Sequence, residues 1–453
     1  MPRWLYVLLI FTVLAPILSL FLQIPPVLLF VIAGLGILPL AALIGQSVEQ
    51  IAEHTGERIG GLLFATFGNA TELIIGIFAL SAGLVDVVRA SIIGSILGNL
   101  MLVLGVSICV GSFKHGRLHF ETRVASQYAS LLALCIDGLI LPAIAELLAS
   151  HTNQPNIFER GVLLSDFIAV MLLIGYIASI LFSVFHVGDK GTEEESEELD
   201  PVLGARSLKA IVRLLAYRRQ VAQSKNPGKS GVLRQIDNTV EAIMAHETGK
   251  IPPAFPNQDQ DQKPAEVHAG QSSTGSVESA STPATRSPVL RARVTGVEHK
   301  APLLPALIIL AIATAGVAVL SEILVGTIEP LTATLKWNPA FVGLIFLPLI
   351  GGLPEYFNTI AMALDKRMGM VLAASAGSSI QIALLLAPIL VLVSIFMPKR
   401  LDLVFSIVEI TVLGLATFLY SEITRDGELV WLEGLLLILL YAIMGATVFL
   451  FGA

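Results

Sequence analysis

The sequence predicts an all-α polytopic membrane protein with about eleven transmembrane helices. The chain has 453 residues, of which 55% are hydrophobic and only 14% are charged, whereas a soluble domain carries about 25% charged residues. The charges are concentrated in short breaks between apolar runs of roughly 20 residues, a length that crosses a bilayer. In addition, two glutamates lie deep inside such runs, in similar local sequence. An acid at that depth is a functional-site hypothesis by default.

The first apolar run, 4–22, follows a single arginine. It is longer than the apolar region of a signal peptide and lacks a clear small-residue cleavage site, so we expect a retained helix. Ten further runs follow, with ends defined to within a few residues. The expected spans are 4–22, 26–45, 60–81, 87–111, 124–147, 162–185, 302–326, 338–364, 368–396, 403–421 and 429–451.

These spans form an N-terminal helix, 1–25, and two five-helix repeats, 26–185 and 302–453. The repeats are separated by a polar loop, 186–301, which contains an acidic run, a basic amphipathic stretch and a low-complexity part that we expect to be disordered. We expect the acidic run to be a solvated face, with Ca²⁺ sensing as the alternative. The basic stretch favours the membrane surface over a protein partner.

The positive charges of the short connections favour a cytoplasmic N-terminus. In that orientation the central loop is cytoplasmic and the C-terminus lies on the opposite side. Eight basic residues then lie inside: Arg3, Arg58, Lys114, Arg117, Arg123, Lys366, Arg367 and Arg425. Five lie outside: Arg89, Arg160, Lys336, Lys399 and Arg400.

An internal repeat relates the two buried acids, Glu72 and Glu355. Since each repeat has five spans, the second enters the membrane from the opposite side, and such inverted repeats place their binding site near the midplane. Glycine or proline precedes each acid, which predicts interrupted helices that line a cavity. One shift of 283 positions relates Glu72 to Glu355, Gly68 to Gly351, Gly94 to Gly377 and Ser95 to Ser378.

The residue types around the two acids fit a hard cation, which takes six to eight oxygen ligands. Histidine and cysteine are absent from these motifs, which argues against zinc or copper. The two acids would neutralise a divalent ion. The other candidate ligands are the side chains of Asn69, Ser95, Asn99, Ser378 and Gln381 and carbonyls near Gly68 and Gly351.

The same two acids suggest proton coupling. Adjacent carboxylates in a dry site cannot both stay charged once the metal leaves, so the metal-bound and the protonated pair are the two favourable states. The alternative for the acids is a structural buried pair, and for the neutral residues it is hydrogen bonding between helices. Three further acids are candidate vestibule residues, with solvated or snorkelling helix ends as the alternative: Glu49, Glu329 and Glu322.

The segment 68–73, Gly-Asn-Ala-Thr-Glu-Leu, resembles the first signature motif of the cation/proton exchanger family, the Ca²⁺/H⁺ antiporters of the Ca²⁺:cation antiporter superfamily. Similar sequence extends from 321 to 384 and over 426–434. The resemblance implies eleven helices in two inverted halves, with Glu72 and Glu355 carrying metal or protons in turn. The family's second motif reads Gly-Asn-Ala-Ala-Glu-His, whereas this chain has Gly-Gly-Leu-Pro-Glu-Tyr at 351–356.

The sequence therefore predicts a secondary active transporter, not an enzyme, that exchanges Ca²⁺ for H⁺ by alternating access. A Na⁺-driven Ca²⁺ exchanger and a passive cation channel are the alternatives. A membrane-embedded hydrolase would need a nucleophile or an HExxH-type motif, which the sequence lacks. No cofactor and no nucleic acid are expected. The partners are the lipid bilayer and the two ions, and the expected location is the plasma membrane, with an organellar membrane as the alternative.

Overall fold

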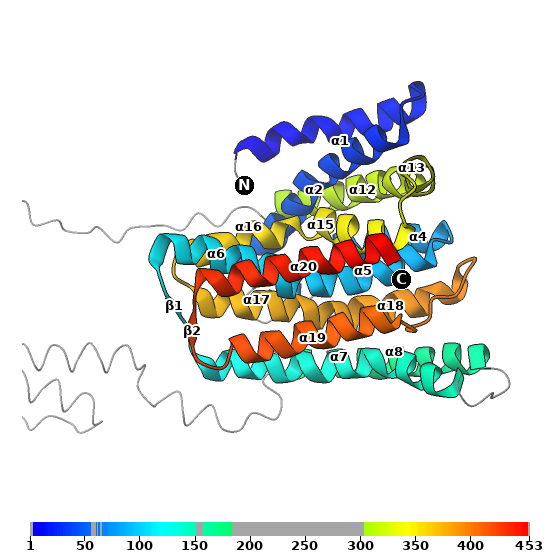
Figure 1. Cartoon of the computed structure of the whole chain (residues 1–453). Coiled ribbons are helices and arrows are strands. Elements are labelled where there is room, and N and C mark those ends of the chain that lie inside the picture. The colour runs from blue at the N-terminus through cyan, green and yellow to red at the C-terminus, as the bar shows by residue number, and fades with distance from the viewer. Residues whose placement is uncertain are drawn as a thin grey trace, which may run out of the picture. The chain divides into compact units, whose positions relative to one another are not determined.

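The computed structural model describes residues 3–55, 60, 62–63, 66–150, 157–183 and 303–451. These residues form helices almost throughout (Figure 1). The polar loop predicted at 186–301, with its acidic run and its basic stretch, lies outside the described residues.

The described residues of the N-terminal half form seven α-helices, which correspond to the first six predicted spans because α5 and α6 together make the fourth span. A π-helical turn, η1, joins α5 to α6. The elements are α1 (Arg3–Phe21), α2 (Pro26–Thr55), α4 (Ala70–Ser81), α5 (Val85–Leu97), η1 (Gly98–Val103), α6 (Leu104–His115), β1 (Leu118–His119), α7 (Thr122–Ser150) and α8 (Ile157–Ser183).

The C-terminal half is more segmented, because short π-helical or 3₁₀ turns interrupt two of its spans. The elements are α12 (Leu303–Gly326), α13 (Ile328–Leu335), α14 (Pro339–Phe341), η2 (Val342–Phe346), α15 (Leu347–Gly351), α16 (Leu353–Leu364), α17 (Met368–Gln381), η3 (Ile382–Leu386), α18 (Ala387–Val393), η4 (Ser394–Phe396), α19 (Ile407–Ile423), β2 (Glu428–Leu429) and α20 (Trp431–Phe451).

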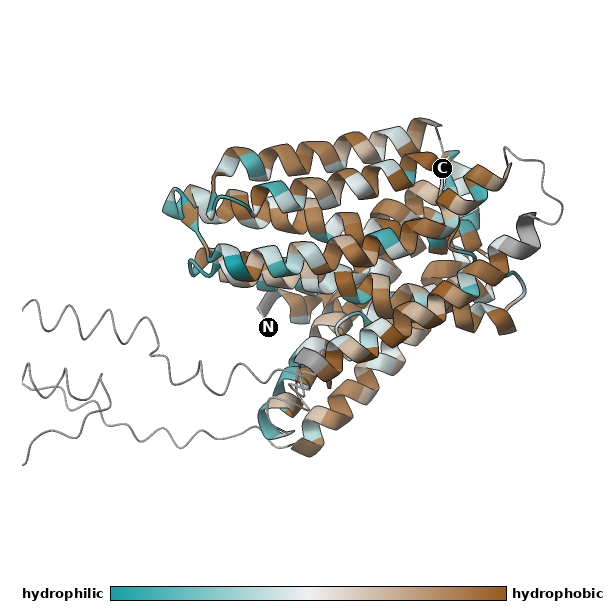
Figure 2. Cartoon of the chain, turned by 90° about the horizontal axis from the view of Figure 1, so that it is seen from below, coloured by the Kyte–Doolittle hydropathy of each residue, from teal (hydrophilic) through white to brown (hydrophobic). Residues whose placement is uncertain are grey.

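In the described part of the chain, seven helices are long and apolar enough to cross a membrane. The bent pair Pro339–Gly351 and Leu353–Leu364 makes eight if it is one span, and Leu5–Phe21 and Ala70–Ser81 are shorter apolar helices. Hydrophobic residues cover the length of the helices and hydrophilic ones gather near their ends (Figure 2). The chain is thus an integral membrane protein, and the count of eleven crossings stays a prediction.

Helix α2 is longer than predicted, since it continues to Thr55 instead of ending near residue 45. The added turns bury Ser47, Val48 and Ile51 and leave Glu49 exposed. One apolar face is enough to hold this part of the helix against the protein without a lipid environment. A search for uniformly apolar runs therefore ends the helix too early.

The helix bounds show the internal repeat that the sequence predicts. Helices α4 and α16 are each 12 residues long, and their bounds differ by the same 283 positions that separate the two acids. The π-helical turn η1 has its counterpart in η3 at the same shift, to within one residue. Helices α4 and α16 also lie toward opposite ends of the bundle (Figure 1), as inverted repeats require.

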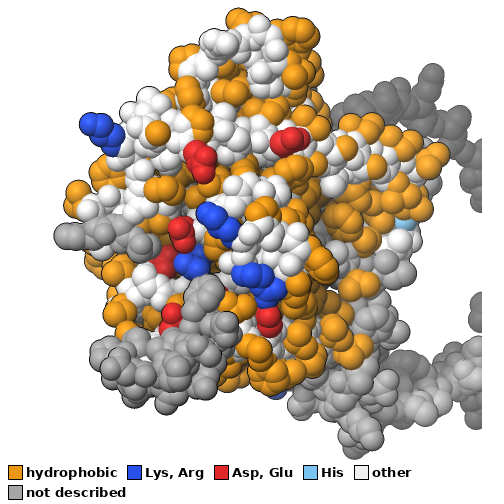
Figure 3. Space-filling model, turned by 90° about the vertical axis from the view of Figure 1, so that its right-hand side faces the viewer, with side chains coloured by type: hydrophobic (Ala, Val, Ile, Leu, Met, Phe, Trp, Pro, Cys, Tyr) orange, Lys and Arg blue, Asp and Glu red, His pale blue; other side chains and the backbone are white. Residues whose placement is uncertain are grey.

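Connections that are distant in sequence meet at the two ends of the bundle. At one end, β1 and β2 form a two-stranded antiparallel ladder, with Leu118 opposite Leu429. At the other end, Arg89 pairs with Asp402, and Arg400 Nη2 donates to both carboxylate oxygens of Asp166 at 2.5 and 2.6 Å. Figure 3 shows this second end, where charged side chains lie within a surround of hydrophobic ones.

Candidate functional site

Each of the two acids lies in the first turn of a helix that begins inside the membrane-spanning region. A turn at Gly68 and Asn69 precedes α4, which carries Glu72. Gly352 separates α15 from α16, which carries Glu355, and the chain bends by 59° there. Because Gly352 lies midway between Pro339 and Leu364, the second break is central in its span. The interruption that glycine and proline predict is thus present at both acids.

Two glycines lie next to the carboxylates. A Cβ added to Gly351 would lie 2.9 Å from Glu72 Cγ, so any side chain at this position would displace this acid. A Cβ added to Gly352 would lie 3.6 Å from Glu72 Oε1 and 3.8 Å from Glu355 Oε2. The two carboxylates, one from each repeat, therefore face the same position at Gly352.

The two carboxylates each hold a buried oxygen that lacks a partner. Glu72 and Glu355 are half-buried residues, but the Oε2 atom of each is shielded from solvent and accepts no hydrogen bond from the described residues. A carboxylate oxygen in this state costs free energy unless a cation or a proton compensates it. The arrangement thus suits a site that always binds one or the other.

Most of the predicted neutral ligands form one hydrogen-bonded network between the repeats. The Asn69 amide donates to Gln381 Oε1 at 3.1 Å. The Ser378 hydroxyl donates to Asn69 Oδ1 at 3.2 Å and accepts from Asn99 Nδ2 at 3.0 Å. Each accepting oxygen keeps a second lone pair that could face a cation. The network therefore joins the two halves and leaves room for ligation.

The remaining predicted residues lie outside this network. Ser95 is buried on α5 and makes no hydrogen bond with any residue that the structure describes. Three acids, proposed as vestibule residues, are all exposed. They are Glu49 on α2, Glu322 on α12 and Glu329 in the first turn of α13.

The described residues contain no group of three or more His, Cys, Asp or Glu side chains that could hold a metal ion. A cation at this site would thus be held by two acids and by neutral oxygens. That donor set suits a hard cation that binds and leaves as cargo more than a resident transition metal.

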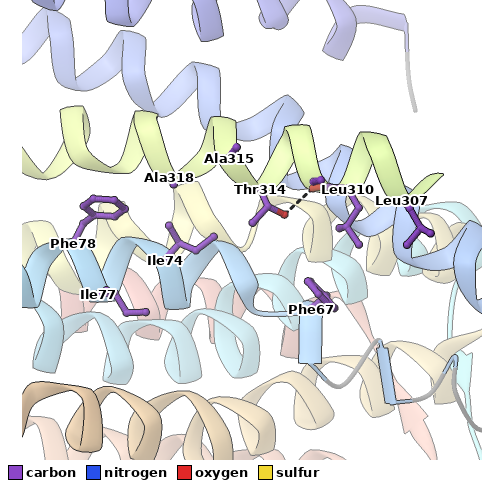
Figure 4. A pocket seen from close by; sticks show the side chains of 10 residues that line it. Phe67, Ile74, Ile77, Phe78, Leu307, Leu310, Thr314, Ala315 and Ala318 are labelled. Atoms are coloured by element: carbon purple, nitrogen blue, oxygen red, sulfur yellow. Dashed lines mark hydrogen bonds between the residues drawn. The ribbon is translucent and has the colours of Figure 1, made fainter. Parts of the chain in front are cut away.

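A separate cavity of about 690 Å³ lies between α4 and α12 (Figure 4). Its walls are apolar, with Phe67, Ile74 and Leu310 among them. Among its described lining side chains the one hydroxyl, on Thr314, donates to the Leu310 carbonyl at 2.7 Å. Because this cavity offers no free oxygen ligand from its side chains, it is not the cation site.

A family described as sodium/calcium exchanger protein matches residues 25–185 and 305–450, which contain both broken spans and both acids. The chain belongs to this family. The match omits the central loop, as the resemblance to cation/proton exchangers implied.

The similarity to individual relatives extends over nearly the whole length of this chain. A Ca²⁺/H⁺ antiporter of Aphanothece halophytica is 31% identical over 422 residues, covering 93% of this chain and 90% of the relative. The Ca²⁺/H⁺ antiporter ChaA of Bacillus subtilis is 29% identical and covers 94% and 93%. The structure of native YfkE superimposes with a TM-score of 0.66 at 26% identity, covering 98% and 99%. The predicted resemblance to Ca²⁺/H⁺ antiporters is confirmed.

Sequence reasoning missed the place of two glycines in the site and the π-helical turns beside it. The sequence predicts Gly352 as part of the helix break and as a departure from the family motif, but not as a position that lies within 4 Å of both carboxylates. Gly98 opens η1 and was not singled out, although the shift of 283 positions pairs it with Gln381. The shift of 283 positions is therefore the sequence signal that could identify Gly98 as a site position. The hydrogen-bonding pattern of a π-helical turn has no comparable signature in the sequence.

Proposed function

We propose that this chain is a secondary active transporter that exchanges Ca²⁺ for H⁺ across a membrane by alternating access. One observation carries the proposal: each of two repeat-related helix breaks is followed by a glutamate in the first helical turn, both carboxylates lie within 4 Å of the Cβ position of Gly352, and the Oε2 atom of each is buried without a partner among the described residues. The choice of Ca²⁺ and H⁺ as the exchanged ions is supported by the relatives from Aphanothece and Bacillus, which are named as Ca²⁺/H⁺ antiporters.

Glu72 and Glu355 are proposed to bind Ca²⁺ and protons in turn. With Ca²⁺ present both carboxylates are charged and neutralise the ion. When Ca²⁺ leaves, two negative charges would remain close together in a medium of low dielectric constant, so protons replace the ion. If only these two neutralised states change their access between the two sides, Ca²⁺ movement is tied to proton movement in the opposite direction.

The proposed neutral ligands are the oxygens of Asn69, Ser95, Asn99, Ser378 and Gln381, with carbonyls near Gly68 and Gly351. They would supply the further oxygens that Ca²⁺ requires. We also propose that the protein resides in the plasma membrane with its N-terminus and its 186–301 loop in the cytoplasm. The excess of basic residues on that side supports this orientation.

Transport by purified protein in liposomes tests the proposal. The lumen is loaded at low pH, ⁴⁵Ca²⁺ is added outside, and both sides are free of Na⁺. We expect accumulation of ⁴⁵Ca²⁺ that stops when a protonophore collapses the pH gradient, with protein-free liposomes as the control. If ⁴⁵Ca²⁺ accumulates only in a second preparation that has an outward Na⁺ gradient and no pH gradient, the protein is a Na⁺-driven exchanger instead. Equilibration that ignores the pH gradient would identify a channel.

A further inference from the structure

The two repeats contribute unequal side chains to the site. In the repeat register, Asn69 corresponds to Gly352 and Gln381 corresponds to Gly98. The first pair of positions is bridged, because Asn69 donates to Gln381 at 3.1 Å. Their repeat counterparts, Gly352 and Gly98, have no side chains and cannot form such a hydrogen bond. One half of the site is closed by hydrogen-bonded side chains and the other half is not.

The equivalent serines show the same asymmetry. Ser378 both donates to Asn69 and accepts from Asn99. Its counterpart Ser95, only 7% exposed, has no hydrogen-bond partner among the residues that the structure describes. The repeat counterpart of Asn99 is Ile382, which has no amide that could donate to Ser95. A hydroxyl that has no protein partner, on a residue that is largely buried, favours a bound water.

The open half also contains unfilled space. Gly98 is buried, yet a Cβ added to it would meet no neighbouring side chain or other element within 4 Å. The space is local, since a Cβ added one turn earlier at Gly94 would lie 2.1 Å from the Leu344 carbonyl oxygen. The turn η1, which Gly98 opens, contacts α16, the helix that begins beside Glu355.

The surroundings of this space are polar enough to hold water. Glu355 Oε2 is buried and unpartnered, and it lies in the first turn of α16, the helix that η1 contacts. A purely apolar cavity stays dry, whereas water is held by several polar partners. Ser95 lies about one turn before Gly98, so together with Glu355 polar groups from both repeats surround this region.

We propose that the site binds a divalent cation that keeps part of its hydration shell. Protein oxygens around Asn69 and Gln381 face the cation from one side. On the other side, water in the space beside Gly98, near Ser95 and Glu355, bridges the cation to the protein. This inference rests on the proposed function, because it concerns the ion that the two acids carry.

The consequence is tolerance toward cations that lose water reluctantly. Mg²⁺ usually keeps several of its waters when it binds to proteins, whereas Ca²⁺ exchanges them readily for protein oxygens. A site with a water-filled half therefore admits Mg²⁺ as a competitor of Ca²⁺. Filling that half with a protein oxygen should exclude Mg²⁺ and preserve Ca²⁺ binding.

The test measures inhibition of pH-driven ⁴⁵Ca²⁺ uptake by Mg²⁺ in liposomes. In the unmodified protein Mg²⁺ should compete with Ca²⁺. Gly98→Gln restores the side chain that the repeat has at Gln381 and should raise the Mg²⁺ concentration needed for half inhibition by about tenfold, the worth of roughly one ordered water. Gly369→Gln, at an open position near the start of α17, is the matched control and should change nothing.

Gly98→Ala adds only the Cβ for which the structure has room, and it should shift Mg²⁺ inhibition in the same direction by a smaller factor. If size-exclusion elution and thermal stability show that Gly98→Gln does not fold, the Mg²⁺ inhibition of Gly98→Ala tests the inference instead. Equal Mg²⁺ inhibition in all folded proteins, or none in the unmodified protein, overturns the inference while Ca²⁺ uptake stands. Absence of pH-driven Ca²⁺ uptake in the unmodified protein instead overturns the proposed function.

Discussion

At the scale of single residues, the contact between Gly351 and Glu72 decides where one of the two carboxylates lies. A side chain at Gly351 would force Glu72 to move, because even a Cβ would come within 3.1 Å of three atoms of Glu72. The glycine therefore acts on the site through the position of the acid. Its presence is a packing requirement of the neighbouring repeat, in addition to the break in its own helix.

We predict that Gly351→Ala lowers pH-driven Ca²⁺ uptake by at least about tenfold, because displacement of a binding group by about 1 Å has effects of that order or larger. Uptake in liposomes measures it. Gly369→Ala, where a Cβ meets no neighbour, is the control. Unchanged uptake in Gly351→Ala would show that Glu72 does not need this position.

The sequence identified the two acids because a carboxylate inside an apolar run is unusual by itself. The neutral residues were harder to assign. Asparagine, serine and glutamine can serve either as ligands or as links between helices, and the sequence does not separate the two uses. The structure shows that Asn69, Asn99, Ser378 and Gln381 are linked to one another, while their role as ligands remains the proposal made above.

At the scale of elements, the site depends on a close crossing of α5 and η2. A Cβ added to Gly94 on α5 would lie 2.1 Å from the Leu344 oxygen, and one added to Gly343 on η2 would lie 2.3 Å from the Val87 oxygen. Two glycines thus let the backbones touch, a common device of membrane helices. The crossing fixes α5, and therefore Ser95, against the second repeat.

We predict that Gly94→Ala and its repeat counterpart Gly377→Ala behave differently. The first forces a methyl group into a backbone carbonyl and should destabilise the fold by about 3 kcal/mol or more. The second meets only Tyr128 Cε1 at 3.8 Å, an ordinary contact. Thermal unfolding in detergent compares them. Equal stability of the two variants would mean that the crossing is looser than described.

Ion pairs fasten the connection between α18 and α19 to the first repeat. Arg89 contacts two acids, Asp402 with a side chain 12% exposed and Asp86 with one 82% exposed. A second pair joins Arg400 to Asp166 on α8. These contacts hold the end of the bundle that Figure 3 shows.

We predict that Asp402→Asn lowers the free energy of unfolding by about 1–3 kcal/mol, because it leaves Arg89 short of its more buried counter-charge. Asp86→Asn, which removes the exposed partner of the same arginine, should change it by less than about 1 kcal/mol. Chemical or thermal denaturation of the two variants gives the comparison. A larger loss in Asp86→Asn would reverse the assignment.

At the scale of the whole molecule, contacts at the two ends agree with an alternating path through the membrane. The ladder of β1 and β2 brings the connection after α6 next to the connection before α20. The Lys399 side chain lies 3.7 Å from the Cβ position of Gly83, which joins the connections after α4 and after η4. In the eleven-span prediction each of these pairs is separated by six crossings and so shares a side.

We predict that cysteine labelling separates the two ends. In a background without Cys109 and Cys135, Lys399→Cys should react with an impermeant maleimide on intact cells. His119→Cys should react only after permeabilisation, since the β1–β2 end is proposed to be cytoplasmic. Both native side chains are exposed. Reaction of both positions from outside would contradict the proposed topology.

Much of the architecture could be predicted because membrane spans and an internal repeat are both legible in one sequence. The shift of 283 positions returns in the bounds of α4 and α16. The prediction failed where the signal is not hydropathy. It ended α2 near residue 45 because the final turns are amphipathic, and it missed the β1–β2 ladder because two residues per strand leave no pattern.

The central claim is that Glu72 and Glu355 bind either Ca²⁺ or protons, and proton release on Ca²⁺ binding tests it most directly. Calorimetry of Ca²⁺ binding to the detergent-solubilised protein, in buffers of different ionisation enthalpy, counts the protons released. We expect release in the unmodified protein, weaker Ca²⁺ binding at lower pH, and loss of both effects in Glu72→Gln and in Glu355→Gln. Ca²⁺ binding without proton release, or unchanged release in either variant, would contradict the account.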